Sequence, residues 1–135
     1  MADEWVLVFE TELPIPMIVS DSTGIERGTL LKMSDPYTVA AAAALNDIVG
    51  GILAEEKVAS DGKAKVPVYR GGIFKAKISG SVTVGDSLVV SGAVANNLVQ
   101  TAAINAEQIV GIALETGTNA ETILIQLKPM TMQLA

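Results

Sequence analysis

The segment IVGGILAEEKVASDGKAKVPVYRGGIFKAKI, residues 48–78 of this 135-residue chain, carries the clearest structural signal in the sequence. It opens with an apolar strand that is expected to end in a double glycine, and an acidic shoulder and a polar turn follow. Two runs of alternating apolar residues come next, and this period of two is typical of half-buried β-strands. Within the turn, Asp61-Gly62 is a pair favoured where the backbone needs positive φ. Gly71-Gly72 separates the alternating runs and predicts a bulge or a bend at a sheet corner.

The two halves of the chain match each other. Each half has a glycine corner, a strand, a small-residue loop, an Ile-Val-Gly strand, a polar turn and an alternating strand. Two copies are too few for a solenoid, but they suit a closed or nearly closed barrel to which each half contributes part of the wall. Chance similarity among Val- and Gly-rich strands is the alternative. The matches are Ile25, Gly28, Leu31 and Ser34 with Val82, Gly85, Leu88 and Ser91, all 57 positions later; Ile48-Val49-Gly50 with Ile109-Val110-Gly111, 61 positions later; and Val66 and Val68 with Ile123 and Ile125, again 57 positions later.

We predict a mainly β fold, a small β-barrel or β-tulip-like sandwich with an internal two-fold sequence repeat and at most one or two short helices. Turn signals about every 8–12 residues between short strands support this fold class. Ala40–Ala44 has strong helix propensity, but the stretch is too short to be stable alone, so helix and loop both stay open. Pro129 is expected to end the last strand. We expect residues 1–16 to be an N-terminal arm or edge strand and residues 17–135 to be one β domain, with pseudo-repeats at about 17–78 and 79–129.

The N-terminal segment holds the densest apolar stretch, residues 5–9. Pro14 and Pro16 frame Ile15, and prolines prevent continuous pairing in a central strand. The segment is therefore either a first strand folded onto its own domain or an arm that adds to the sheet of a neighbouring subunit. Trp5 is expected to be an anchor in either case. The candidate contact residues are Trp5, Val6, Leu7, Val8, Phe9 and Ile15.

Composition excludes several classes of function. The net charge is −6, and the nine Lys and Arg residues form no basic run, so nucleic-acid binding is not expected. An acidic N-terminus is not a secretory signal, and no apolar run approaches the roughly 20 residues of a membrane-spanning helix. We expect a soluble chain made in the cytoplasm. Charged residues are 18% of the chain, below the roughly 25% of typical domains, which favours a surface partly covered by another protein; a weakly charged monomer is the alternative.

Catalytic chemistry is not expected. The chain has no His and no Cys, so the common general base, nucleophile and transition-metal ligands are missing. The remaining polar groupings have structural explanations. Glu55 and Glu56 are neighbours on a strand and face opposite ways, and Glu10 with Glu12 is explained as charge that protects a strand edge from aggregation. Asp21 with Ser22 offers one carboxylate, which is too few for a calcium loop, and Ser60 with Asp61 and Lys63 lies on an exposed turn, which cannot activate a nucleophile. No catalytic, cofactor or metal residue is therefore assigned.

Residues 25–127 resemble the decoration, or head cement, proteins of tailed bacteriophages, in particular the lambda-type decoration protein. The likeness rests on the order and spacing of motifs that are low in chemical specificity. It implies a small β domain that trimerises and clamps neighbouring major capsid subunits after the shell expands. It also implies an N-terminal arm that orders on the capsid, although residues 1–16 show no specific match. The motifs are IVGGILAEEK at 48–57, DGK at 61–63, VYRGGIF at 68–74, SGSVTVGD at 79–86 and IVGIALETGTNAETILIQL at 109–127.

From this resemblance we expect a virion structural protein on the outer capsid surface that bridges major capsid protein subunits as a homotrimer. Neither nucleic acid nor membrane is expected as a partner. The alternative is a glycan- or ligand-binding β module of a head fibre or vertex. Sugar sites usually present several aromatic faces, whereas Trp5, Tyr37 and Tyr69 are widely spaced in this sequence.

Overall fold

The computed structural model describes residues 3–42, 44, 47–91, 97–102 and 108–131. These residues form eleven strands and no helix, so the prediction of a mainly β fold is confirmed. The strands are β1 (Val6–Phe9), β2 (Ile15–Ile18), β3 (Leu30–Asp35), β4 (Thr38–Ala41), β5 (Val49–Leu53), β6 (Lys65–Tyr69), β7 (Gly72–Lys77), β8 (Ser87–Val90), β9 (Val99–Thr101), β10 (Gln108–Ala113) and β11 (Thr122–Thr131).

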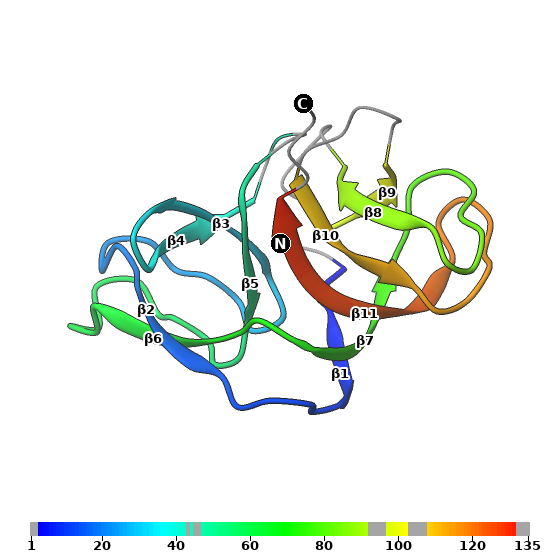
Figure 1. Ribbon diagram of the computed structural model, residues 1–135. Coiled ribbons are helices and arrows are strands. Elements are labelled where there is room, and N and C mark those ends of the chain that lie inside the picture. The colour runs from blue at the N-terminus through cyan, green and yellow to red at the C-terminus, as the bar shows by residue number, and fades with distance from the viewer. Residues whose placement is uncertain (1–2, 43, 45–46, 92–96, 103–107, 132–135) are drawn as a thin grey trace.

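The strands divide into two sheets that lie side by side (Figure 1). Strands β2-β4-β3-β5-β6 close into a barrel, which we call unit 1. The other sheet has the order β1-β7-β11-β10-β8-β9, and we call its strands β7–β11 unit 2. The chain crosses from unit 1 to unit 2 at Gly71-Gly72, between β6 and β7, which confirms the predicted bend.

The two units have the same internal arrangement. The order β4-β3-β5-β6 in unit 1 corresponds to β9-β8-β10-β11 in unit 2, and β2 corresponds to β7. A parallel bridge joins the ends of each unit, Ile18↔Thr38 in one and Ile78↔Val99 in the other. The antiparallel bridge Ile25↔Lys57 likewise has its counterpart in Val82↔Gly117. The internal repeat is therefore present in strand order and pairing as well as in sequence.

Alternating strands supply two hydrophobic clusters. One fills the barrel and includes Met17, Leu31 and Val68. The larger one joins the outside of β5 to unit 2 and includes Ile52 and Phe74. All five residues of β5 are buried because one face looks into the barrel and the other packs against unit 2. A strand covered on both faces reads as a continuous apolar run in the sequence.

Two strands continue through residues that were expected to end them. β5 passes through Gly50 and Gly51, because a Cβ at Gly51 would collide with the carbonyl oxygen of Tyr69 and only glycine allows that approach. β11 passes through Pro129. β7 pairs with β11 only as far as Leu127, so the proline lies where β10 is the one remaining neighbour, close to a register shift. A proline is tolerated there since its missing N–H breaks no ladder.

The alanine-rich stretch is partly extended. Ala40 and Ala41 belong to β4 and pair with Lys32 and Leu31, so strand pairing overrides their helix propensity. Ala43 lies outside the described residues. The Asp61-Gly62 turn is present, with φ +85° at Gly62.

Candidate docking surface

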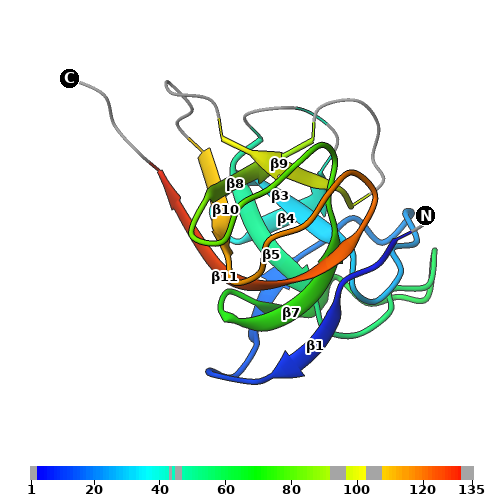
Figure 2. The ribbon, with the colours of Figure 1, turned by 90° about the vertical axis from the view of Figure 1, so that its right-hand side faces the viewer.

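The N-terminal segment forms the edge of the second sheet. β1 runs antiparallel to β7, with Val6 opposite Lys75 and Leu7 opposite Phe74. Figure 2 shows β1 beside β7 at the rim of the sheet. Within this single chain the strand folds onto its own domain, and its addition to the sheet of a neighbouring subunit stays a prediction.

Trp5 anchors this segment between the two units. Its side chain is 4% exposed, and its ring meets Phe74 edge-on at a centroid distance of 5.8 Å. The indole Nε1 donates a hydrogen bond to the Asn97 carbonyl oxygen at 3.0 Å, and the Trp5 backbone N–H donates to Gly28 at 2.8 Å. Edge-to-face aromatic pairs and a satisfied indole N–H are typical of a well-packed buried tryptophan. Trp5 is therefore an anchor, and the residues that hold it belong to this chain.

Exposed apolar side chains concentrate just after this anchor. Five of the eleven exposed large apolar side chains in the described part of the chain fall between residues 6 and 18, and the most exposed are Phe9 at 64% and Leu13 at 76%. This segment crosses from β1 to β2 along one side of the molecule, at the bottom of Figure 1. We call it the apolar strip; its exposed members are Val6, Val8, Phe9, Leu13 and Ile18.

The six predicted contact residues therefore lie in three different environments. Val6, Val8 and Phe9 are exposed on the strip. Leu7 is partly buried against the core, and Trp5 is fully inside it. Ile15 is half-buried and lines a groove of about 420 Å³ at the start of β2. Whether any of these residues contacts a capsid stays a prediction.

The groove at β2 adds residues that the sequence analysis missed. Ile15, Pro16, Ile18, Tyr37 and Lys65 line it, and Tyr37 is largely exposed. Tyr37 follows β3 in the chain and reaches the groove because Ile18 pairs with Thr38 where the barrel closes. No local sequence pattern signals this, since it depends on pairing between residues 20 positions apart.

The aromatic residues do not share one open face. Trp5, Tyr69 and Phe74 line a second groove of about 400 Å³ between the units, whereas Tyr37 lies in the groove at β2. Tyr69 also meets Phe74 edge-on at 5.8 Å, and its hydroxyl donates to Glu10 at 2.9 Å. Burial, and then the hydrogen bond to Glu10, raise the pKa of Tyr69. The rings of Trp5 and Phe74 are almost entirely covered, so they offer no open face for stacking a sugar.

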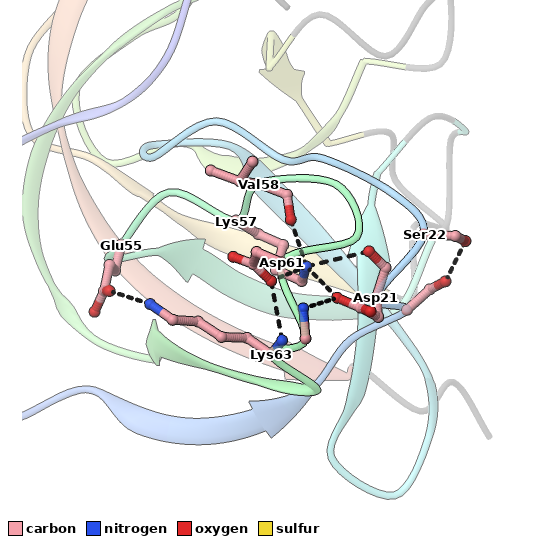
Figure 3. Close-up of polar contacts among 9 residues, drawn as sticks. Asp21, Ser22, Glu55, Lys57, Val58, Asp61 and Lys63 are labelled. Carbon is pink, nitrogen blue, oxygen red and sulfur yellow. Dashed lines mark hydrogen bonds and ion pairs between the residues drawn. The ribbon is translucent and has the colours of Figure 1, made fainter.

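A buried lysine holds two turns of unit 1 together (Figure 3). Lys57 is 1% exposed, and its Nζ lies 2.9 Å from Asp21 Oδ1 and 2.6 Å from Asp61 Oδ1. It also donates to the backbone carbonyls of Asp21 and Val58, at 3.2 and 2.6 Å. The ammonium group is thus surrounded by acceptors, as a buried charge requires. We call this group of contacts the Lys57 clamp.

The electrostatics of the Lys57 clamp follow from these contacts. Burial acts to lower the pKa of Lys57, but the hydrogen bonds with Asp61 and Asp21 outweigh it and hold the pKa above its ordinary value. The hydrogen bond from Lys57 in turn lowers the pKa of Asp61 to about 2. Sequence reasoning assigned Asp21 and Asp61 to plain turns and did not single out Lys57, because a lone lysine after two glutamates reads as a surface residue.

The other polar groupings are not brought together as a reactive site. Lys63 Nζ lies 3.3 Å from Glu55 Oε1, so its ion-pair partner is a carboxylate and not Ser60. The Ser22 hydroxyl lies 3.0 Å from that of Ser20 within the turn. Among the described residues no group of three or more His, Cys, Asp or Glu is placed to hold a metal ion. The same residues contain no helix long and apolar enough to cross a membrane.

Comparison with known proteins gives a fold and no family. No protein-family model matches the chain, and no curated protein matches it. One matching solved structure is the crystal structure of the head fibre gp8.5 N base of bacteriophage phi29, with a TM-score of 0.53 and 14% sequence identity. The match covers 89% of this chain and 97% of that one. The chain therefore shares its fold with the base of a phage head fibre.

Proposed function

We propose that this chain is a structural protein of a bacteriophage head that binds the outer surface of the expanded capsid and bridges neighbouring major capsid protein subunits. Two independent likenesses support it: the motifs shared with phage decoration proteins, and the fold shared with a phage head fibre base. The single observation that carries the proposal is the apolar strip, which begins on the paired strand β1 and is left exposed. Exposed apolar surface of this kind marks a contact with another protein.

Cementing requires binding and no chemistry. A protein that binds only the assembled lattice stabilises that state by mass action, and repeated weak contacts on a symmetric shell add through multivalency. A chain with net charge −6 is repelled by packaged DNA, which directs it to the outside of the shell. We further propose a homotrimer as the binding form, which rests on the resemblance to decoration proteins.

The fold likeness also favours a second candidate, a module at the base of a head fibre or at a vertex. Copy number separates the two. Mass spectrometry of purified particles would quantify this chain against the major capsid protein. A ratio near one to one supports a decoration protein, a handful of copies supports the fibre or vertex module, and absence from particles refutes both.

A binding experiment tests the apolar strip itself. In the variant Phe9→Ser/Leu13→Ser, two exposed side chains lose about 1.5–3 kcal/mol each of possible burial, so affinity for expanded shells should fall at least tenfold, since each 1.4 kcal/mol is about tenfold. The matched control is Val84→Ser/Leu114→Ser, which changes two exposed apolar residues outside the strip. Equal affinity of the two variants would show that the strip is not the capsid contact.

A further inference from the structure

The repeat allows each residue of β2 to be matched with one of β7. Met17 pairs with Val66 in unit 1, and Ala76 pairs with Ile123 in unit 2. Val66 and Ile123 are themselves matched, 57 positions apart. Met17 therefore corresponds to Ala76. It follows that Pro16 corresponds to Lys75 and Pro14 corresponds to Ile73.

In unit 2, β1 pairs with the edge of β7 that contains these matched positions. Lys75 and Ile73 are the residues of β7 opposite Val6 and Phe9 of β1. The backbone N–H of Ile78 donates towards β11, to Glu121 at 3.0 Å. Because N–H groups alternate sides along a strand, those of Lys75 and Ile73 point the other way, towards β1.

In unit 1 the matching edge lacks both donors. The N–H of Val19 donates to Ala64 beside β6, and the N–H of Ile18 donates to Tyr37 on the opposite side. The backbone at position 16, and at position 14 before the strand, therefore has its N–H side directed away from β6. Both residues are prolines and have no N–H to donate there. Among the described residues, β2 meets β4 only at the bridge Ile18↔Thr38, so no strand covers this outer edge of β2.

β1 carries a free edge of its own. Within the described residues it pairs only with β7, and its sequence, VLVF, has neither charge nor proline to guard the other side. Unguarded apolar edges invite pairing between chains. Pairing of β1 with β1 of a second copy is opposed by charge, because Asp3 and Glu4 precede the strand and Glu10 and Glu12 follow it. The groove along the outer edge of β2 is lined by Lys65 and by no acidic side chain.

We propose that Pro14 and Pro16 close the outer edge of β2 to the β1 strand of a second copy of this chain. β1 already occupies the equivalent edge of unit 2, so the shape of unit 1 would accept it and the missing N–H groups prevent it. A contact between β1 of one copy and β2 of the next joins two different surfaces, and such contacts propagate into open filaments unless the ring closes. The prolines thus keep the chain from polymerising through its own edges. This inference does not depend on the proposed function.

The test restores the two donors. The variant Pro14→Ile/Pro16→Lys carries the residues found at the matching positions of β7, and we expect species larger than wild type whose mass rises with concentration in sedimentation velocity. Pro67→Val is the matched control. Pro67 lies opposite Pro16 but faces β5, where its carbonyl accepts from Ala54 at 2.9 Å, so its replacement opens no edge and should sediment as wild type.

A second set of variants identifies the strand that pairs with the outer edge of β2. Adding Val6→Lys and Phe9→Lys to Pro14→Ile/Pro16→Lys places charges on β1 and should abolish the association; association that persists would overturn the assignment to β1. Circular dichroism checks folding, and if the double variant does not fold, Pro16→Lys alone restores one donor and is measured in the same way. A folded variant that sediments as wild type would overturn the proposal.

Discussion

Replacing Trp5 measures how firmly the N-terminal segment is fixed to its own domain. Trp5→Ala removes a nearly fully buried ring, its edge contact with Phe74 and the hydrogen bond from its indole to Asn97. Loss of a buried tryptophan costs about 3–5 kcal/mol. That is a large share of a typical unfolding free energy of about 5–15 kcal/mol. Trp5→Phe keeps most of the apolar burial and loses the donor, so about 1–2 kcal/mol is expected.

The assay is equilibrium urea unfolding followed by far-ultraviolet circular dichroism, because Trp5 is the only tryptophan and its removal abolishes the fluorescence signal. Val6→Ala, a neighbouring change at an exposed position, is the control and should shift stability by less than about 0.5 kcal/mol. A loss below about 1 kcal/mol for Trp5→Ala would mean that the anchor contributes far less than its burial indicates. In that case the segment would be a free arm in solution, and the reasoning from the β1–β7 pairing would fail.

Three further predictions concern unit 1. Gly51→Ala should destabilise the chain by more than about 1 kcal/mol, seen as a lower thermal midpoint, because φ is +136° there and the new Cβ would meet Tyr69. The pKa of Asp61 is about 2 against an ordinary 3.8, so its contribution to stability should be complete above pH 4 and lost as pH falls towards 2; Asp61→Asn should flatten the unfolding free energy in that window. Lys57→Met should lower stability at pH 7, and its effect should not add to that of Asp61→Asn, because both variants break one network; additive losses in a double-mutant cycle would refute the clamp.

Several features of this molecule were legible in the sequence because they depend on neighbours in the chain. The alternation around Val66–Val68 and Phe74–Ile78 marks β6 and β7, and the Asp61-Gly62 pair marks the turn between β5 and β6. The spacing of 57 between matched residues shows two copies of one unit, and these have the same strand order in space. The alternation of a strand and the residues of a turn are each determined within a few positions, so both can be recognised from the sequence alone.

Only the tertiary structure decided which strands pair and which side chains are enclosed. The N-terminal segment had two possible partners in the sequence, and in the folded chain β1 pairs with β7. Lys57 becomes a buried clamp since Asp21, 36 residues away in the chain, lies against it, and Pro129 stays inside β11 because the neighbouring strand β7 has already ended. Each outcome depends on free energies of contact between residues distant in the chain. A local pattern contains none of those terms, so the sequence shows the strands and their repeat, while pairing, burial and the apolar strip require the fold.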